Sequence, residues 1–395
     1  MNPEILVWAR KTAGLTLEGA ATKVGIRDAY GMAAVDRLAA LERGENDPTR
    51  PVLVKMAQHY RRPLLAFYLA EPPPQGARGA DFRRLTVPRR VETEALIDAL
   101  VRNVRSRQGM VRSVLETEDE AVPLPFVGGL SRSSSPSDAR EGLRSVLSHD
   151  LTVREYYAQR SPEEAFALIR SKVEAAGVFV ILKGDMGNYQ SAIDVDVFRG
   201  FAIADNIAPF VVINDNDSIP AWSFTLLHEV VHLLLGQTGI SGGAHPGTES
   251  ERFCNNIAAE WMLPAETLHQ VEIDRDVTVQ QQHIGEFARP RNLSHTMVAY
   301  RLLRSGRLDQ QTFEQLRMVF RKQWQTARDR QRVRARETDG GPNYYVVRRH
   351  RVGQALLGFT SRMLESDALS MTKAARILDI KPVQVDKLLR RASTT

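Results

Sequence analysis

Apolar residues at helical spacing mark the first stretch of the chain and predict an all-helical module over residues 1–70. Within this module, Thr16 is suited to cap the start of a helix and Gly25 is suited to end it. A proline-rich run followed by glycine, Pro-Pro-Pro-Gln-Gly, then predicts a linker over residues 71–85.

The pattern between residues 86 and 275 predicts an α+β domain. Its first part is mostly helical and is interrupted at residues 121–125 and by the serine-rich stretch 131–137. Short, continuous apolar runs then predict three buried strands, at residues 178–182, 200–204 and 210–214. The expected fold class is therefore α+β, predominantly helical with a small sheet.

Two helices follow the predicted strands. The first runs from about Ser223 to Leu235 and is apolar nearly all round, which is typical of a buried helix. Gly236 is suited to end it. A glycine-rich loop that runs to Gly247 separates it from a second helix over residues 249–262.

Two helical regions are predicted after the α+β domain. Residues 276–338 form a helical, helix-turn-helix-like extension whose arginine-dense end, Arg317 to Arg336, either contacts phosphates or is a solvated helix face. Residues 343–395 form a small module with two or three short helices. Within it, residues 369–382 resemble a helix-turn-helix, for which DNA reading and packing or dimerisation are both open.

His228, Glu229 and His232 form the most informative chemical pattern of the chain. A spacing of four residues places both imidazoles on one face of a helix, one turn apart, where they can share a metal ion. Glu229 can reach a water molecule without being a ligand, as metal-assisted hydrolysis requires. Such a short pattern also arises by chance, but burying these polar side chains in an apolar helix is costly without a partner such as a metal.

A catalytic zinc site with one open position needs a third protein ligand. The extended pattern, with a histidine six residues after His232, fails because residue 238 is threonine. His245 in the loop is one candidate. Glu251 is the better candidate because it lies near the start of the next helix, although the helix dipole alone also favours a glutamate there. Three residues are candidates for stabilising an oxyanion: His245, His295 and Tyr300.

Composition limits the class of protein. The 395 residues are 43% hydrophobic and 25% charged, which indicates a soluble globular chain of two or three domains. The one cysteine, Cys254, excludes an intrachain disulfide and fits a reducing compartment. Neither a secretory signal nor an apolar run of membrane-spanning length is evident. We therefore expect a cytoplasmic protein without a membrane partner, and a homodimer stays open.

Four separated segments resemble, in order, the ImmA/IrrE family of metallopeptidases. They are residues 199–201, 208–214, 224–235 and 251–264. The resemblance implies a zincin-like, gluzincin-type core in which His228 and His232 bind zinc, Glu229 is the catalytic base and Glu251 completes the site. Ile257 stands where the family usually has phenylalanine, and Cys254 stands where it has a small residue. Both changes are mild and apolar, and they leave the ligands intact.

The resemblance also implies a partner. Members of the family cut repressor proteins in stress responses or mobile-element induction, so the expected substrate is a regulatory protein, a transcriptional repressor. Residues 9–18 and 41–57 resemble the opening and close of an XRE-like, phage-repressor-like helix-turn-helix. Residues 26–38 between them are longer than usual and rich in alanine and glycine, so this module is a candidate for binding DNA or protein.

The alternative to an endopeptidase is a DNA-binding transcriptional regulator whose metallopeptidase-like domain acts as a sensor. This alternative rests on the two terminal modules and the arginine-dense run. It makes DNA an expected partner, bound with a steep dependence on salt.

Overall fold

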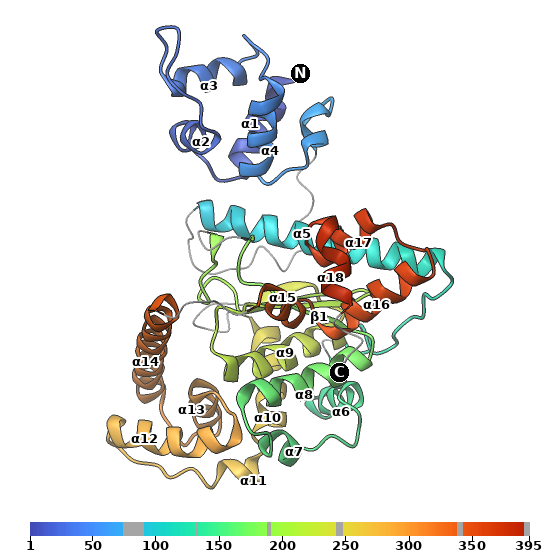
Figure 1. Cartoon of the computed structure of the whole chain (residues 1–395). Coiled ribbons are helices and arrows are strands. Elements are labelled where there is room, and N and C mark those ends of the chain that lie inside the picture. Colours follow the sequence, from blue (N-terminus) through green and yellow to red (C-terminus); the bar gives the residue numbers. More distant parts are fainter. Residues whose placement is uncertain (74–90, 132, 188–190, 242–247, 338–342, 391–395) are drawn as a thin grey trace. The chain divides into compact units, whose positions relative to one another are not determined.

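The computed structural model describes residues 1–73, 91–131, 133–187, 191–241, 248–337 and 343–390 (Figure 1). The chain divides into two compact units, Met1–Val104 with Asp185–Ile193, and Arg105–Gly184 with Asp194–Thr395. Most of the predicted linker lies outside the described residues. The domain boundaries predicted at residues 275 and 338 stay predictions.

The N-terminal module is all-helical. Its elements are α1 (Pro3–Thr12), α2 (Leu17–Val24), α3 (Ala34–Glu42), α4 (Arg50–His59) and the 3-10 helix η1 (Leu64–Tyr68). The hydroxyl of Thr16 accepts a hydrogen bond from the Gly19 amide, and Gly25, with a φ of +73°, ends α2, as predicted. The buried side chains that hold these helices together include Ile5, Leu38 and Met56.

The stretch between α2 and α3 contains a tight turn. Ala29 and Met32 form an antiparallel bridge around Tyr30 and Gly31, which both have positive φ. This turn occupies part of the extra length that the sequence has between the two helices. The resemblance of residues 1–70 to an XRE-like module stays a prediction.

The sheet of the larger unit has four strands in the order β1-β3-β2-β4. They are β1 (Phe179–Leu182), β2 (Gly200–Ile203), β3 (Phe210–Ile213) and β4 (Gly239–Ser241). β1 and β3 are parallel, whereas β2 pairs antiparallel with both β3 and β4. Every residue of β1, β2 and β3 is buried, which explains their continuous apolar runs. The three predicted strands are confirmed, and β4 lies where we expected only a glycine-rich loop.

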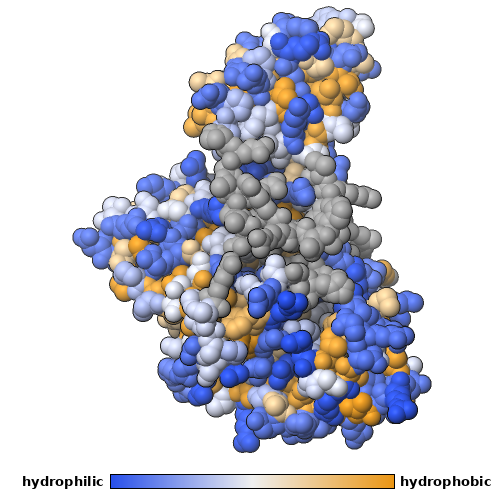
Figure 2. All heavy atoms as spheres, turned by 180° about the vertical axis from the view of Figure 1, so that it is seen from behind, coloured by the Kyte–Doolittle hydropathy of each residue, from blue (hydrophilic) through white to orange (hydrophobic). Residues whose placement is uncertain are grey.

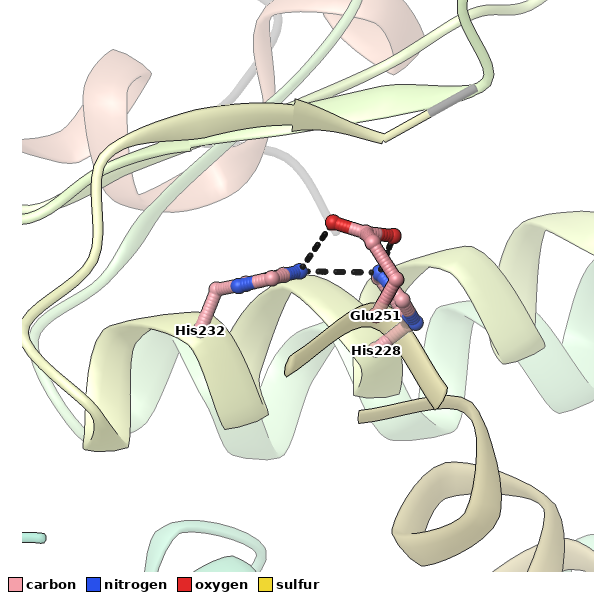
Figure 3. A group of neighbouring side chains, drawn as sticks. All are labelled: His228, His232 and Glu251. Carbon is pink, nitrogen blue, oxygen red and sulfur yellow. Dashed lines mark hydrogen bonds and ion pairs between the residues drawn. The ribbon is translucent and has the colours of Figure 1, made fainter. Parts of the chain in front are cut away.

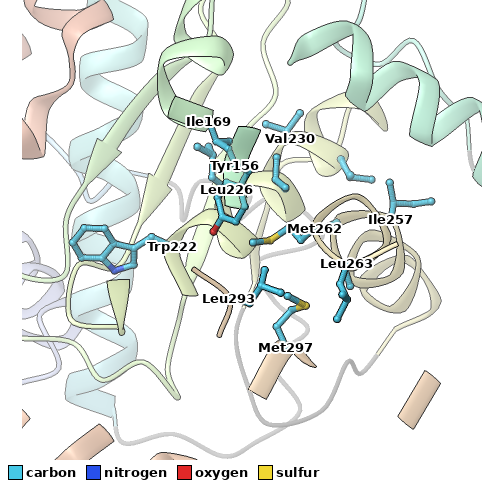
Figure 4. Packing of buried hydrophobic residues seen from close by; sticks show 14 of the residues in the cluster. Tyr156, Ile169, Trp222, Leu226, Val230, Ile257, Met262, Leu263, Leu293 and Met297 are labelled. Atoms are coloured by element: carbon cyan, nitrogen blue, oxygen red, sulfur yellow. The ribbon is translucent and has the colours of Figure 1, made fainter. Parts of the chain in front are cut away.

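Helix α9 (Ile219–Leu234) packs against the sheet, and three helices pack around it. They are α6 (Pro136–Val146), α8 (Pro162–Ala175) and α10 (Glu249–Met262). Figure 4 shows side chains of α8, α9 and α10 in one core, with Leu226 and Val230 contributed by α9. The helix starts four residues before the predicted Ser223, because Pro220 is tolerated in its first turn. Gly236, with a φ of +63°, follows its end as predicted.

The remaining elements of this unit are helical. Before the sheet lie α5 (Val91–Thr117), which begins in the N-terminal unit, and α7 (Val153–Tyr157). After α10 come α11 (Ala265–Leu268), α12 (Val277–Ala288), η4 (Arg289–Arg291), α13 (His295–Arg304) and α14 (Gln310–Glu337). The buried core is continuous from Ala139 to Phe320. The α+β class, mostly helical with a small sheet, is therefore confirmed.

The described C-terminal residues, 343–390, form four short α-helices, where we expected two or three. They are α15 (Tyr344–Val352), α16 (Gln354–Glu365), α17 (Met371–Leu378) and α18 (Val385–Leu389), with the 3-10 helix η5 (Pro382–Gln384) before the last. Helix α16 covers β1, and the rings of Phe179 and Phe359 meet with centroids 6.0 Å apart. Helices α15 and α16 thus pack on the sheet of the larger unit.

Hydrophobic and hydrophilic side chains are interspersed on the face of the molecule shown in Figure 2. The large apolar side chains that are exposed come from several parts of the chain, for example Tyr30, Leu65 and Val383. Among the described helices, none combines the length and the apolar character needed to cross a membrane.

Candidate metal centre

Two histidines of α9 and a glutamate of α10 converge on one point. The Nε2 atoms of His228 and His232 are 3.0 Å apart, and the carboxylate oxygens of Glu251 lie 3.3 Å and 3.2 Å from them (Figure 3). One candidate ligand atom from each residue lies within 4.8 Å of the others. The structure therefore brings together the three residues that were predicted as metal ligands.

The positions of the three side chains follow from how α9 and α10 form and pack. The imidazoles of His228 and His232 come from successive turns of α9, and their side chains are 4% and 5% exposed. Thr248 caps α10, its hydroxyl accepting a hydrogen bond from the Glu251 amide at 3.2 Å. The apolar side of α10, which includes Ile257, packs on α9 and holds the first turn of α10 beside the two histidines.

The electrostatics of the cluster favour positive charge. Burial opposes ionisation of Glu251, but hydrogen bonds with His228 and His232 outweigh burial and hold the pKa of Glu251 well below its usual range. Burial lowers the pKa of His232, whereas Cys254, Glu251 and Glu229 raise it by more. A site that stabilises a proton on an imidazole also suits a divalent cation, which competes with that proton for the same nitrogen.

The donor set fits a zinc ion. Two imidazole nitrogens and a carboxylate oxygen form one of the ligand sets of catalytic zinc sites, which keep a further position open for water or substrate. Both histidines present Nε2 to the common point, and Glu251 faces both of them. His228, His232 and Glu251 would therefore hold the metal.

Glu229 is fully buried, and its carboxylate lies against strand β2. A Cβ atom added at Gly200 would lie 2.8 Å from Oε1 of Glu229 and 2.6 Å from Cγ2 of Thr225, both too close for a real side chain. Glycine at position 200 therefore leaves the space that Glu229 occupies between α9 and the sheet. This contact gives a physical reason for the glycine in the segment Arg199-Gly200-Phe201.

The other residues considered for the site have different surroundings. His245 lies outside the described residues. The hydroxyl of Thr238, where an extended motif would have histidine, accepts a hydrogen bond from the Ala204 amide at 2.9 Å. His295 packs edge-on against Phe320, and burial lowers its pKa. The hydroxyl of Tyr300 donates to Asn256 of α10 at 2.9 Å.

Two residues near the cluster were not predicted. Oε1 of Gln237 lies 3.2 Å from Nδ1 of His232 and accepts a hydrogen bond from the hydroxyl of Ser250 at 2.7 Å. The sequence offered one indication of these residues, which is their place in the chain: Gln237 follows the helix-ending Gly236, and Ser250 precedes Glu251. Position alone could not indicate contact, because the residues lie on separate elements.

Comparison with known proteins gives a match for one part of the chain. Residues 174–303 match the model of the peptidase M78 family, described as an IrrE N-terminal-like domain. Curated proteins and solved structures gave no match. The matched segment contains the whole sheet, α9 and α10, and it therefore supports a metallopeptidase-like hydrolase with a protein substrate and a metal ion at the His-His-Glu cluster.

Proposed function

We propose that this chain is a zinc-dependent endopeptidase that cleaves a specific regulatory protein. The observation that carries the proposal is the convergence of His228, His232 and Glu251, with Glu229 on the same helix, inside the segment that matches a peptidase family. The resemblance to the ImmA/IrrE family favours a transcriptional repressor as the substrate, cut in a stress or mobile-element response.

Each residue has a distinct role in this proposal. His228, His232 and Glu251 hold the metal, and the helices that carry them are fixed by the buried core. When bound there, zinc would supply a Lewis acid that polarises the scissile carbonyl and acidifies a water molecule. Glu229 takes the proton of that water and passes it to the leaving amine. Burial among apolar side chains strengthens these electrostatic interactions.

The decisive variant is Glu229→Gln, which keeps the size of the side chain and removes the base. We expect the purified variant to keep about one zinc per chain and to lose cleavage of its partner. The same variant, used as bait, should retain the uncut substrate and so identify it. Glu249→Gln, the same change at an exposed position of α10, is the matched control and should cleave normally. Full cleavage by Glu229→Gln with zinc retained would refute the assigned mechanism.

A second candidate function is a DNA-binding regulator in which the peptidase-like domain is a sensor. It is favoured by the geometry of α17 and α18, which are joined through Asp379 in the left-handed conformation. Apolar side chains of these two helices are buried, among them Ala375, Ile377, Val385 and Leu388. The chain after the turn exposes the basic side chains of Lys381, Lys387 and Arg390. Sequence-specific DNA binding by Glu229→Gln, with a steep dependence on salt, would support this function, and binding at the non-specific level only would remove it.

A further inference from the structure

We propose that Gln237 and Ser250 are positioning residues that orient His232 for metal binding. The inference rests on the proposed metal centre and adds two residues outside the ligand set. The pair links the loop after α9 to the first turn of α10, so it connects the two elements that carry the second and third ligands. Its role is to hold one imidazole in one orientation and one tautomer.

The two ring nitrogens of His232 have different neighbours. Nε2 faces the ligand cluster, 3.0 Å from Nε2 of His228 and 3.2 Å from Oε1 of Glu251. Nδ1 faces away from the cluster and lies 3.2 Å from Oε1 of Gln237. An amide oxygen accepts hydrogen bonds and cannot donate them, so the hydrogen of the neutral ring lies on Nδ1. The lone pair of Nε2 is then directed at the metal position.

Ser250 supports the orientation of the Gln237 amide in which Oε1 faces the histidine. Its hydroxyl donates to the same Oε1 at 2.7 Å, so the oxygen accepts two hydrogen bonds at once. With the amide rotated the other way, its NH2 group would donate to Nδ1, and the ring hydrogen would move to Nε2, where the metal has to bind. The arrangement with Oε1 toward His232 is therefore the one that leaves Nε2 available.

The backbone holds Gln237 at this place. Gly236 adopts the left-handed conformation after α9, and the Gln237 amide donates to the carbonyl oxygen of His232 at 2.9 Å. The backbone and the side chain of Gln237 thus contact the same residue. Ser250 precedes Glu251 in a turn capped by Thr248, so moving Ser250 would also move the third ligand.

The experiment measures zinc affinity of the full chain by competition with a chromogenic chelator. Outer partners of metal-bound histidines typically contribute 10- to 100-fold in affinity. We expect Gln237→Met to weaken zinc binding by about this factor, and Ser250→Ala to weaken it by less because one acceptor bond to His232 remains. The substitution Gln237→Glu should keep the zinc affinity of wild type, since a carboxylate also accepts a hydrogen bond from Nδ1 of His232. Gln311→Met, at an exposed position of α14, is the matched control.

The outcomes separate this inference from the proposed function. If wild type does not bind zinc, the metal centre itself is refuted and the inference falls with it. If wild type binds zinc and Gln237→Met binds it within about twofold, the inference is overturned while the metal centre stands. A purely structural role is also distinguishable, because Gln237→Met would then lower the unfolding temperature of metal-free and zinc-bound protein equally and leave the affinity unchanged.

Discussion

Two of the clusters of largely buried charged side chains in the described part of the larger unit balance charge in different ways. The metal-centre cluster consists of His228, Glu229, His232 and Glu251. The second, which we call the β1–α17 cluster, consists of Arg107, Lys183, Arg348 and Asp379. In the second cluster the carboxylate is balanced by lysine and arginine, whereas in the first the groups that face Glu251 are imidazoles.

This difference separates a structural cluster from a candidate catalytic one. Nζ of Lys183 lies 2.6 Å from Asp379, and the guanidinium groups of Arg348 and Arg107 donate to carbonyl oxygens at the end of α17. The β1–α17 cluster thus fixes the C-terminal helices to the sheet with charges that the chain itself supplies. A pair of imidazoles beside a carboxylate, by contrast, becomes a cation site once a metal displaces protons from the ring nitrogens.

The largest expected effect comes from removing the metal. Chelation should abolish cleavage of the captured partner, and added zinc should restore it, because the proposed mechanism depends on the ion that His228, His232 and Glu251 would hold. At zinc concentrations 100 to 1,000 times the dissociation constant, chelation should also lower the free energy of unfolding by about 3 to 4 kcal/mol. The measurement is partner cleavage together with calorimetry. Cleavage that persists after complete zinc removal would place the chemistry elsewhere.

The next largest effect is expected from Lys183→Met in the β1–α17 cluster. The change removes the cation nearest to Asp379, at 2.6 Å, and leaves Arg348 at 3.4 Å, so it should cost up to about 3 kcal/mol of unfolding free energy. Urea titration measures this loss. The double variant Lys183→Met/Asp379→Leu should recover only part of it, because the carboxylate that offsets the charges of Arg107 and Arg348 is then missing. Zinc affinity should stay at the wild-type value in both variants, and a loss of affinity would show that the two clusters are coupled.

Gly200→Ala tests the packing that confines Glu229. The added methyl group would collide with Glu229 and Thr225, so we expect a loss of about 1 to 3 kcal/mol in stability. Cleavage should fall more steeply than zinc affinity, because the displaced group is the proposed base and not a proposed ligand. Gly358→Ala in α16 is the control, since its methyl group would have no heavy atom within 4 Å. Equal effects of the two substitutions on cleavage would contradict the role given to Gly200.

The sequence indicates the metal-centre cluster but not the β1–α17 cluster, because the residues of the first lie closer together along the chain. His228 and His232 are one helical turn apart and Glu251 starts the next helix, so a local pattern indicates that they meet. Their roles as ligands stay a prediction. The β1–α17 cluster joins residues 107, 183, 348 and 379, and no local pattern connects positions so far apart.

The same distinction explains which parts of the fold were predictable. Continuous apolar runs indicated β1, β2 and β3, and the Thr16 cap and the Gly25 end indicated α2. Strand β4 was missed because Gly239–Ser241 has little strand propensity and exists through its pairing with β2. The contact between Gln237 and His232 was missed for a related reason, since it depends on the turn made at Gly236 and on the packing of α10.

The smallest expected effect is an acid dependence of stability that arises in the β1–α17 cluster. Burial opposes ionisation of Asp379, but Lys183, Arg107 and Arg348 outweigh it and lower the pKa of Asp379 to about 2. A carboxyl whose pKa is lower in the folded chain than in the unfolded chain stabilises the fold above about pH 4. That stabilisation is lost as the pH falls through about 2.

The difference between wild type and Asp379→Asn isolates this contribution from that of Glu251, whose pKa is also lowered. We expect wild type to exceed Asp379→Asn in unfolding free energy by on the order of 2 kcal/mol at pH 6. The difference should shrink steadily between about pH 4 and pH 2, as followed by urea titration at each pH. Asp386→Asn, at an exposed position of α18, should show no such trend. A difference that stays constant down to pH 2 would mean that the charge of Asp379 does not hold α17 to the sheet.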